Sequence, residues 1–107
     1  MSLKAYQQQI DDTVQQYVTP YWSPLSIFAR IAEEVGEVSR ILNAQYGDKP
    51  KKPNEEHEDL GDELADIVYA VICLANREGI DLDPHMQNAI NKLLTRDKDR
   101  FEKKQPA

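Results

Sequence analysis

Two short groups of acidic residues carry the chemistry that this sequence can offer. The first is Glu33-Glu34-Val35-Gly36-Glu37 and the second is Glu63-Leu64-Ala65-Asp66. Each lies in a segment whose apolar residues recur every three or four positions, as they do along one face of a helix. Carboxylates on such a face are costly to bury unless a partner compensates their charge. We expect that partner to be a cation.

The position of each acid around its helix orders the first group. At roughly 100° per residue, Glu34 falls between Ile27 and Ile41 on the apolar arc. Glu37 lies just outside this arc and Glu33 lies farther out. Glu34 is therefore expected to be buried, within an arc that also contains Phe28, Ile31, Val35, Val38 and Leu42.

The second group repeats the arrangement. Glu63 falls between Ala70 and Leu74 on an apolar face and is also expected to be buried, while Asp66 follows at its border. The rest of that face is predicted to consist of Leu60, Leu64, Ile67, Val68 and Val71. Packing the two helices together would gather four acids, namely Glu34, Glu37, Glu63 and Asp66.

Four gathered carboxylates need compensation, because like charges about 4 Å apart repel by roughly 4 kcal/mol at an effective dielectric near 20. Protonation, Arg or Lys partners, or a metal ion could supply it. All four offer oxygen and no His or Cys joins them, which favours Mg²⁺ or Mn²⁺ over Zn²⁺. A plainer alternative for Glu33 and Glu37 is surface ion pairing with Arg30 or Arg40.

The elements that must position these acids are helices. The periodicity and breakers predict helices over about 3–18, 24–47 and 55–77, and a fourth that starts at Asp81 or Asp83. The lysine- and proline-rich segment 47–54 is predicted to be an exposed loop. We expect an all-α, four-helix bundle-like domain. It would have much apolar surface left to cover, which a homodimer or homotetramer would bury.

Length and composition exclude several classes of protein. The 107 residues fit one domain, 1–107, with its core at about 5–101. A net charge of −6 argues against a duplex nucleic-acid binder. Neither an export signal nor roughly 20 consecutive apolar residues occur, and Cys73 is the one cysteine, so we expect a cytoplasmic protein without membrane segments or an intrachain disulfide.

The acidic spacing, Glu33-Glu34-x-x-Glu37 followed 26 positions later by Glu63-x-x-Asp66, resembles the signature of the MazG-like all-α nucleoside triphosphate pyrophosphohydrolases. The likeness extends through residues 23–37 and 62–76 and indicates the short single-domain branch. It implies Mg²⁺-dependent hydrolysis of an NTP or dNTP to the monophosphate and pyrophosphate by a homo-oligomer, in a role of nucleotide-pool house-cleaning.

The resemblance also assigns roles by position. Glu34, Glu37, Glu63 and Asp66 match residues that hold metal. Glu33 matches a position that orients or deprotonates the attacking water, so Glu33 and Glu34 are the expected catalytic residues.

Substrate contacts are predicted more broadly. Tyr69 and Asn76 share a side of their helix with Asp66 and could face the nucleoside, and Trp22 could stack on the base. Alternatively, Tyr69 is an aromatic residue of the core, Asn76 is a helix-end residue and Trp22 only packs against its neighbours. The phosphates need cations, which Lys92, Arg96, Lys98 and Arg100 could supply, or these residues form a solvated tail. Arg100-Phe101 resembles the family's Arg-aromatic step, but Asp97 replaces an expected Asn.

Three rival functions are considered. A di-iron carboxylate bundle would require Glu-x-x-His, but Asn54 and Leu82 precede the two histidines at that spacing. Phosphoribosyl-ATP hydrolysis is disfavoured because Tyr69-Ala70 replaces an expected Tyr-His step. A non-catalytic nucleotide-sensing or interaction module that keeps the metal site remains open.

Overall fold

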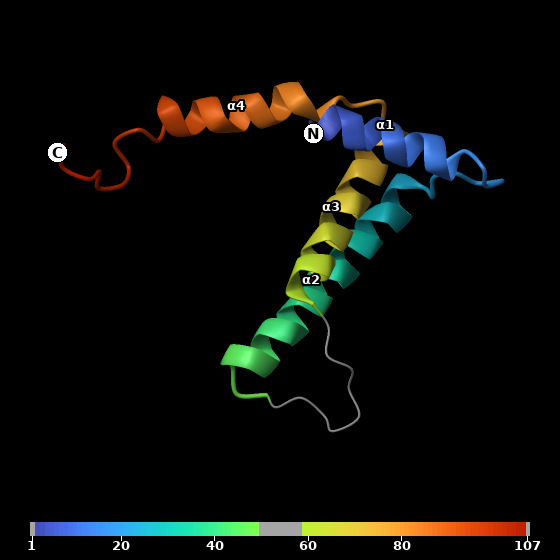
Figure 1. The fold of residues 1–107 in the computed structure, drawn as a ribbon, viewed down its shortest axis with the longest axis horizontal. Helices are drawn as coiled ribbons and strands as arrows, with labels where there is room; N and C mark the ends of the chain where they lie inside the picture. The colour runs from blue at the N-terminus through green and yellow to red at the C-terminus, as the bar shows by residue number, and fades with distance from the viewer. Residues whose placement is uncertain (1, 50–58, 107) are drawn as a thin grey trace.

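The computed structural model describes residues 2–49 and 59–106, which contain four helices and, within those ranges, no strand (Figure 1). The helices are α1 (Leu3–Val14), α2 (Pro24–Tyr46), α3 (Leu60–Arg77) and α4 (Leu82–Leu94). The predicted all-α, four-helix class is confirmed. The start predicted near residue 55 for the third helix, and most of the predicted loop, lie outside the described residues.

Side-chain caps begin each helix. Every N-cap is a Ser or Asp whose oxygen accepts a backbone N–H of the first turn, which leaves fewer amides without a partner. Pro24 follows its cap at the first helical position, where its missing N–H costs nothing. The four caps are Ser2, Ser23, Asp59 and Asp81.

The helix ends depend on turn geometry. α1 stops at Val14 rather than at the predicted Val18, because Tyr17 N–H bonds to the Val14 carbonyl in a tighter turn and Pro20 prevents helix beyond it. Just after α3, Gly79 adopts φ 70°, a left-handed conformation that favours glycine. There Ile80 N–H bonds to the Ala75 carbonyl at 2.8 Å, so α3 ends near the predicted glycine.

Two long helices form the centre of the molecule. α2 and α3 run antiparallel and share the most extensive packing, while α1 crosses the end of α3 and α4 leads away from α1 (Figure 1). The buried apolar residues gather where α1, α2 and α3 meet and where α2 and α3 pack, and none belongs to α4. They are Val14, Ile27, Ile41, Ala70, Ile72 and Ala75.

The apolar faces predicted for α2 and α3 are only partly buried in one chain. Ile27 and Ile41 are buried as expected, but Phe28, Val35 and Leu42 of the same arc are 61%, 50% and 39% exposed. On α3, Leu64, Val68 and Val71 are exposed as well. The single chain thus leaves much apolar surface uncovered, as the sequence predicts, because α2 and α3 each meet one long neighbour and that neighbour covers only part of an apolar arc.

Candidate active site

Three of the predicted acids meet across the seam between the two long helices. Glu34 of α2 and Glu63 and Asp66 of α3 each offer a carboxylate oxygen, and these oxygens lie within 4.8 Å of one another. Glu34 occupies the stripe between the buried Ile27 and Ile41. Glu34 and Glu63 are half-buried rather than buried, while Asp66 is exposed. The site therefore lies at the rim of the seam.

The other two predicted acids lie outside this cluster. The Glu37 carboxylate accepts a hydrogen bond from Arg40 Nη2 at 2.8 Å, which is the surface pair that the sequence left open. Glu33, which is also on α2, is exposed. The described residues thus gather three of the five acids of the two motifs.

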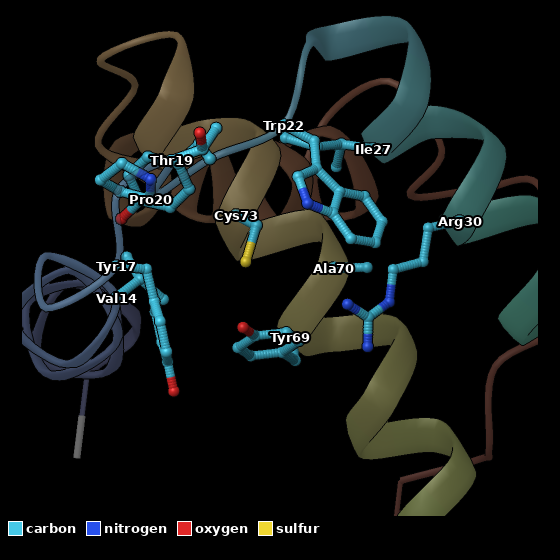
Figure 2. A pocket seen from close by; sticks show the side chains of 11 residues that line it. Val14, Tyr17, Thr19, Pro20, Trp22, Ile27, Arg30, Tyr69, Ala70 and Cys73 are labelled. Atoms are coloured by element: carbon cyan, nitrogen blue, oxygen red, sulfur yellow. The ribbon is translucent and has the colours of Figure 1, made fainter.

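An aromatic pocket adjoins the acids. A cavity of about 350 Å³ opens between the end of α1, the start of α2 and the middle of α3 (Figure 2). Tyr69, one helical turn beyond Asp66, contributes to its wall, as do Trp22 and Arg30. The volume is at the lower end of the range for small-molecule sites. The remaining lining residues are Val14, Tyr17, Thr19, Pro20, Tyr21, Ile27, Ala70 and Cys73.

Arg30 connects the pocket to the acids. Its guanidinium carbon lies 5.7 Å from the centre of the Trp22 ring and 5.4 Å from that of Tyr69, both within the range of cation–π attraction. Its Nε lies 3.8 Å from a carboxylate oxygen of Glu34. Figure 2 shows the guanidinium reaching toward the Tyr69 ring.

Burial raises the pKa values of the pocket's weak acids. Burial raises the pKa of the Cys73 thiol, and burial together with a hydrogen bond to Cys73 raises that of Tyr69. The pKa of Tyr21 is raised to about 12, first by burial and then by its hydrogen bond to Asp11. These groups are uncharged at neutral pH, as they also are at their usual pKa values, and the shifts extend the neutral form to higher pH. Arg30 supplies the positive charge of the pocket lining.

A buried polar network supports the pocket from behind. Gln7, 7% exposed, donates to the Asn76 side chain at 2.9 Å and to the Ile80 carbonyl at 2.8 Å, and it accepts Leu82 N–H at 3.0 Å. Asn76 in turn donates to the Gln7 carbonyl and to the Tyr21 hydroxyl, each at 3.0 Å. The Asn76 amide is thus engaged within the protein, which favours the helix-end alternative; its contact with substrate remains a prediction.

Comparison with known proteins identifies the family of this chain. The sequence model of the MazG nucleotide pyrophosphohydrolase domain matches residues 22–101. The chain belongs to this family. It is 38% identical to the uncharacterized protein YpjD of Bacillus subtilis strain 168 over 104 residues, 97% of this chain and 94% of YpjD.

Solved structures agree with the assignment. The crystal structure of B. subtilis YpjD, described as a candidate pyrophosphatase, superposes with a TM-score of 0.78 at 35% identity and covers 89% of this chain and 97% of its own. That of a MazG protein conserved in Bacillus, a nucleotide pyrophosphohydrolase, gives 0.75 at 37% identity, with 94% and 97% covered. The protein is therefore a MazG-family enzyme of the nucleotide pyrophosphohydrolase class.

The predicted phosphate-binding cations of this MazG chain lie apart from its acids. Lys92 lies on α4, which leads away from the α2–α3 pair (Figure 1). Beyond that helix, Arg96 pairs with Asp97 at 3.2 Å, and Arg100 stacks over Phe101 at 5.5 Å. Lys98 also follows α4 and is exposed. Within one chain these residues do not join the candidate site.

Sequence reasoning missed two residues of the MazG site and its support. Gln7 lies on the apolar stripe of α1 between Leu3 and Val14, so the helical periodicity that places Glu34 on an apolar face also places Gln7 on one. For Arg30, the sequence predicts only a surface ion pair with Glu33 or Glu37. Its position one helical turn before Glu34 was visible, but its stacking on two rings from other segments was not.

Proposed function

We propose that this MazG protein hydrolyses a nucleoside triphosphate or deoxynucleoside triphosphate at the α-phosphorus. Water would form a bond to that phosphorus, the bond to the oxygen bridging the α- and β-phosphates would break, and pyrophosphate would leave the monophosphate. The observation that carries this proposal is the cluster of Glu34, Glu63 and Asp66 beside an aromatic pocket of nucleoside size.

The donor set fits a hard divalent cation. The three carboxylates offer only oxygen within 4.8 Å of one another, which suits Mg²⁺ and also Mn²⁺. Glu37 would complete the set by exchanging Arg40 for the ion. A bound Mg²⁺ would neutralise the triphosphate and polarise the α-phosphorus.

The side chains around the cluster would do the remaining work. Glu33, exposed beside Glu34, would orient the attacking water and accept its proton. Trp22 and Tyr69 would hold the base against their rings in the pocket. Enclosure there would fix the nucleoside so that its phosphates extend toward the acids.

Oligomerisation would complete the site. Lys92, Arg96, Lys98 and Arg100 could reach the phosphates only if another copy places its α4 region over the acids. The exposed apolar face that includes Phe28, Val35 and Leu42 gives a second copy a reason to bind. We therefore propose a homodimer or homotetramer as the active form.

The cellular role follows from the proposed reaction. An enzyme that converts nucleoside triphosphates to monophosphates removes the triphosphates from the precursor pool. We therefore propose that the protein clears unwanted nucleotides in the cytoplasm, a house-cleaning role. In the described residues, no helix is both long and apolar enough to cross a membrane.

A substrate panel tests the function. Purified protein would be incubated with the common NTPs and dNTPs and Mg²⁺, and pyrophosphate and monophosphate would be measured. We expect equal amounts of both products from a subset of bases, with no release in EDTA. Nucleotide binding without product on every substrate would show that the protein is a sensing module instead.

A further inference from the structure

Arg30 is the one cation among the lining residues of the aromatic pocket, and it also contacts the acidic cluster. Its side chain is 37% exposed and that of Glu34 is 18% exposed, so the pair is partly shielded from water. The 3.8 Å separation of Nε and the carboxylate oxygen exceeds a hydrogen bond. Glu34 therefore holds Arg30 mainly through charge, and the contact can be exchanged.

The two aromatic contacts fix where the guanidinium lies. Its central carbon is within 6 Å of the ring centres of both Trp22 and Tyr69, which come from different segments of the chain. A base that stacks on either ring must pack against the guanidinium or move it. Arg30 thus stands between the nucleoside pocket and the acids, where the phosphate nearest the nucleoside would pass.

A divalent cation and Arg30 compete for the same carboxylate. An ion bound to Glu34 would satisfy that charge and repel the guanidinium. Five N–H donors in a planar fork would then be available beside the pocket, and this geometry suits phosphate oxygens. Cation binding at the acids would in this way determine whether the Arg30 guanidinium is available to a nucleotide in the pocket.

We propose that Arg30 is an exchangeable substrate-binding residue that pairs with Glu34 in the ion-free protein and binds the α-phosphate of the nucleotide once a divalent cation occupies the acids. The proposal rests on the proposed function, because it takes the pocket as the nucleoside site. It assigns to Arg30 opposite effects on its two ligands. Arg30 weakens binding of the cation alone and strengthens binding of the nucleotide.

Binding measurements on Arg30→Met test both effects. Mn²⁺ affinity without nucleotide would be followed by the EPR signal of the free ion. Nucleotide affinity would be followed by calorimetry with the α,β-methylene analogue of the best substrate at saturating Mg²⁺. We expect Mn²⁺ to bind about two- to fivefold more tightly, as the loss of one partly exposed ion pair allows. The analogue should bind at least tenfold more weakly, as the loss of a charged hydrogen bond requires.

Two further variants separate this role from a structural one. Arg30→Lys keeps the positive charge but not the planar set of N–H donors. Its Mn²⁺ affinity should therefore match that of the wild type, and its nucleotide affinity should fall between those of the wild type and Arg30→Met. Arg77→Met removes an equal charge from an exposed position at the end of α3 and should change neither affinity.

The possible outcomes are distinct. Unchanged or weaker Mn²⁺ binding by Arg30→Met, with helical content preserved in circular dichroism, would overturn the competition with Glu34. Unchanged analogue binding would overturn the contact with phosphate. A wild-type protein that hydrolyses no nucleotide would instead refute the proposed function, and the Mn²⁺ titration would still decide whether Arg30 opposes the cation.

Discussion

Glu34 occupies the middle of a stripe whose ends, Ile27 and Ile41, are only 3% and 7% exposed. A carboxylate in that position gains nothing from packing and is repelled by Glu63 and Asp66 across the seam. Arg30 offsets part of that cost in the ion-free protein. The residue-scale features of the site are therefore best explained by a ligand that the acids bind together.

Neutralising one acid should remove catalysis without unfolding the protein. Asp66→Asn is expected to lower Mg²⁺-dependent turnover at least 100-fold, because the amide lacks the charge that we propose holds the cation. Glu37→Gln should do the same if Glu37 exchanges Arg40 for the ion. Pyrophosphate release measures the effect, and Glu78→Gln, exposed at the end of α3, is the matched control. Full activity of Asp66→Asn would refute the site.

The protonation of Tyr21 predicts how stability depends on alkaline pH. Its pKa is about 12 in the folded protein and about 10 when unfolded, mainly because of burial. The folded state therefore keeps a proton that the unfolded state releases, and the free energy of unfolding should fall as the pH rises from about 10 to 12. Urea titrations should show a smaller decline for Tyr21→Phe. An equal decline in both proteins would contradict this assignment.

At the scale of elements, Gln7 joins three of the four helices. Its side chain bonds to Asn76 at the end of α3, to the α3–α4 connection at Ile80 and to the first residue of α4, Leu82. A single amide thus fixes the crossing of α1 over α3 and the point from which α4 departs. Because Asn76 also bonds to Tyr21, the network supports one wall of the aromatic pocket.

Replacing Gln7 should be costly for its size. Gln7→Leu keeps the volume but leaves the Ile80 carbonyl and the Leu82 N–H without this partner, so we expect a loss of about 2–4 kcal/mol in the free energy of unfolding. Gln9→Leu, on the exposed side of α1, should change it by less than about 0.5 kcal/mol. Urea denaturation compares them. Equal effects of the two substitutions would show that the network contributes little.

At the scale of the molecule, one chain is extended and leaves apolar surface exposed. Its radius of gyration is 18.0 Å, whereas a compact domain of about 100 residues measures about 13 Å. None of the α4 residues is buried, and large apolar side chains are exposed on α2, α3 and α4. Surfaces of this kind mark interfaces between proteins, and association of copies would cover them.

A charge placed on the exposed face of α2 should therefore prevent assembly. Val35→Glu is expected to convert an oligomer into monomers and to lower activity, because burying an unpaired carboxylate between copies is costly. Light scattering after size-exclusion chromatography measures the mass. Gln45→Glu adds the same charge at another exposed position of α2 and should leave the mass unchanged. A monomeric, active wild-type protein would exclude the proposed oligomer.

The sequence alone determined the features that are local to a helix. Caps such as Ser23 and the breaker Gly79 define helix ends through bonds to neighbouring backbone groups. Helical periodicity placed Glu34 between Ile27 and Ile41, because the angle between residues of one helix is fixed. The acidic spacing also indicated the MazG family, which the comparisons confirmed.

The tertiary structure decided what each face meets. Periodicity does not set the rotation or the register of one helix against another, since both depend on how two whole surfaces pack. Only the packed structure shows that Glu34 meets Glu63 and Asp66 while Glu37 pairs with Arg40, and that Arg30 lies between Trp22 and Tyr69. It likewise shows that α4 leads away from the acids (Figure 1), with Gln7 bonded to the first residue of that helix.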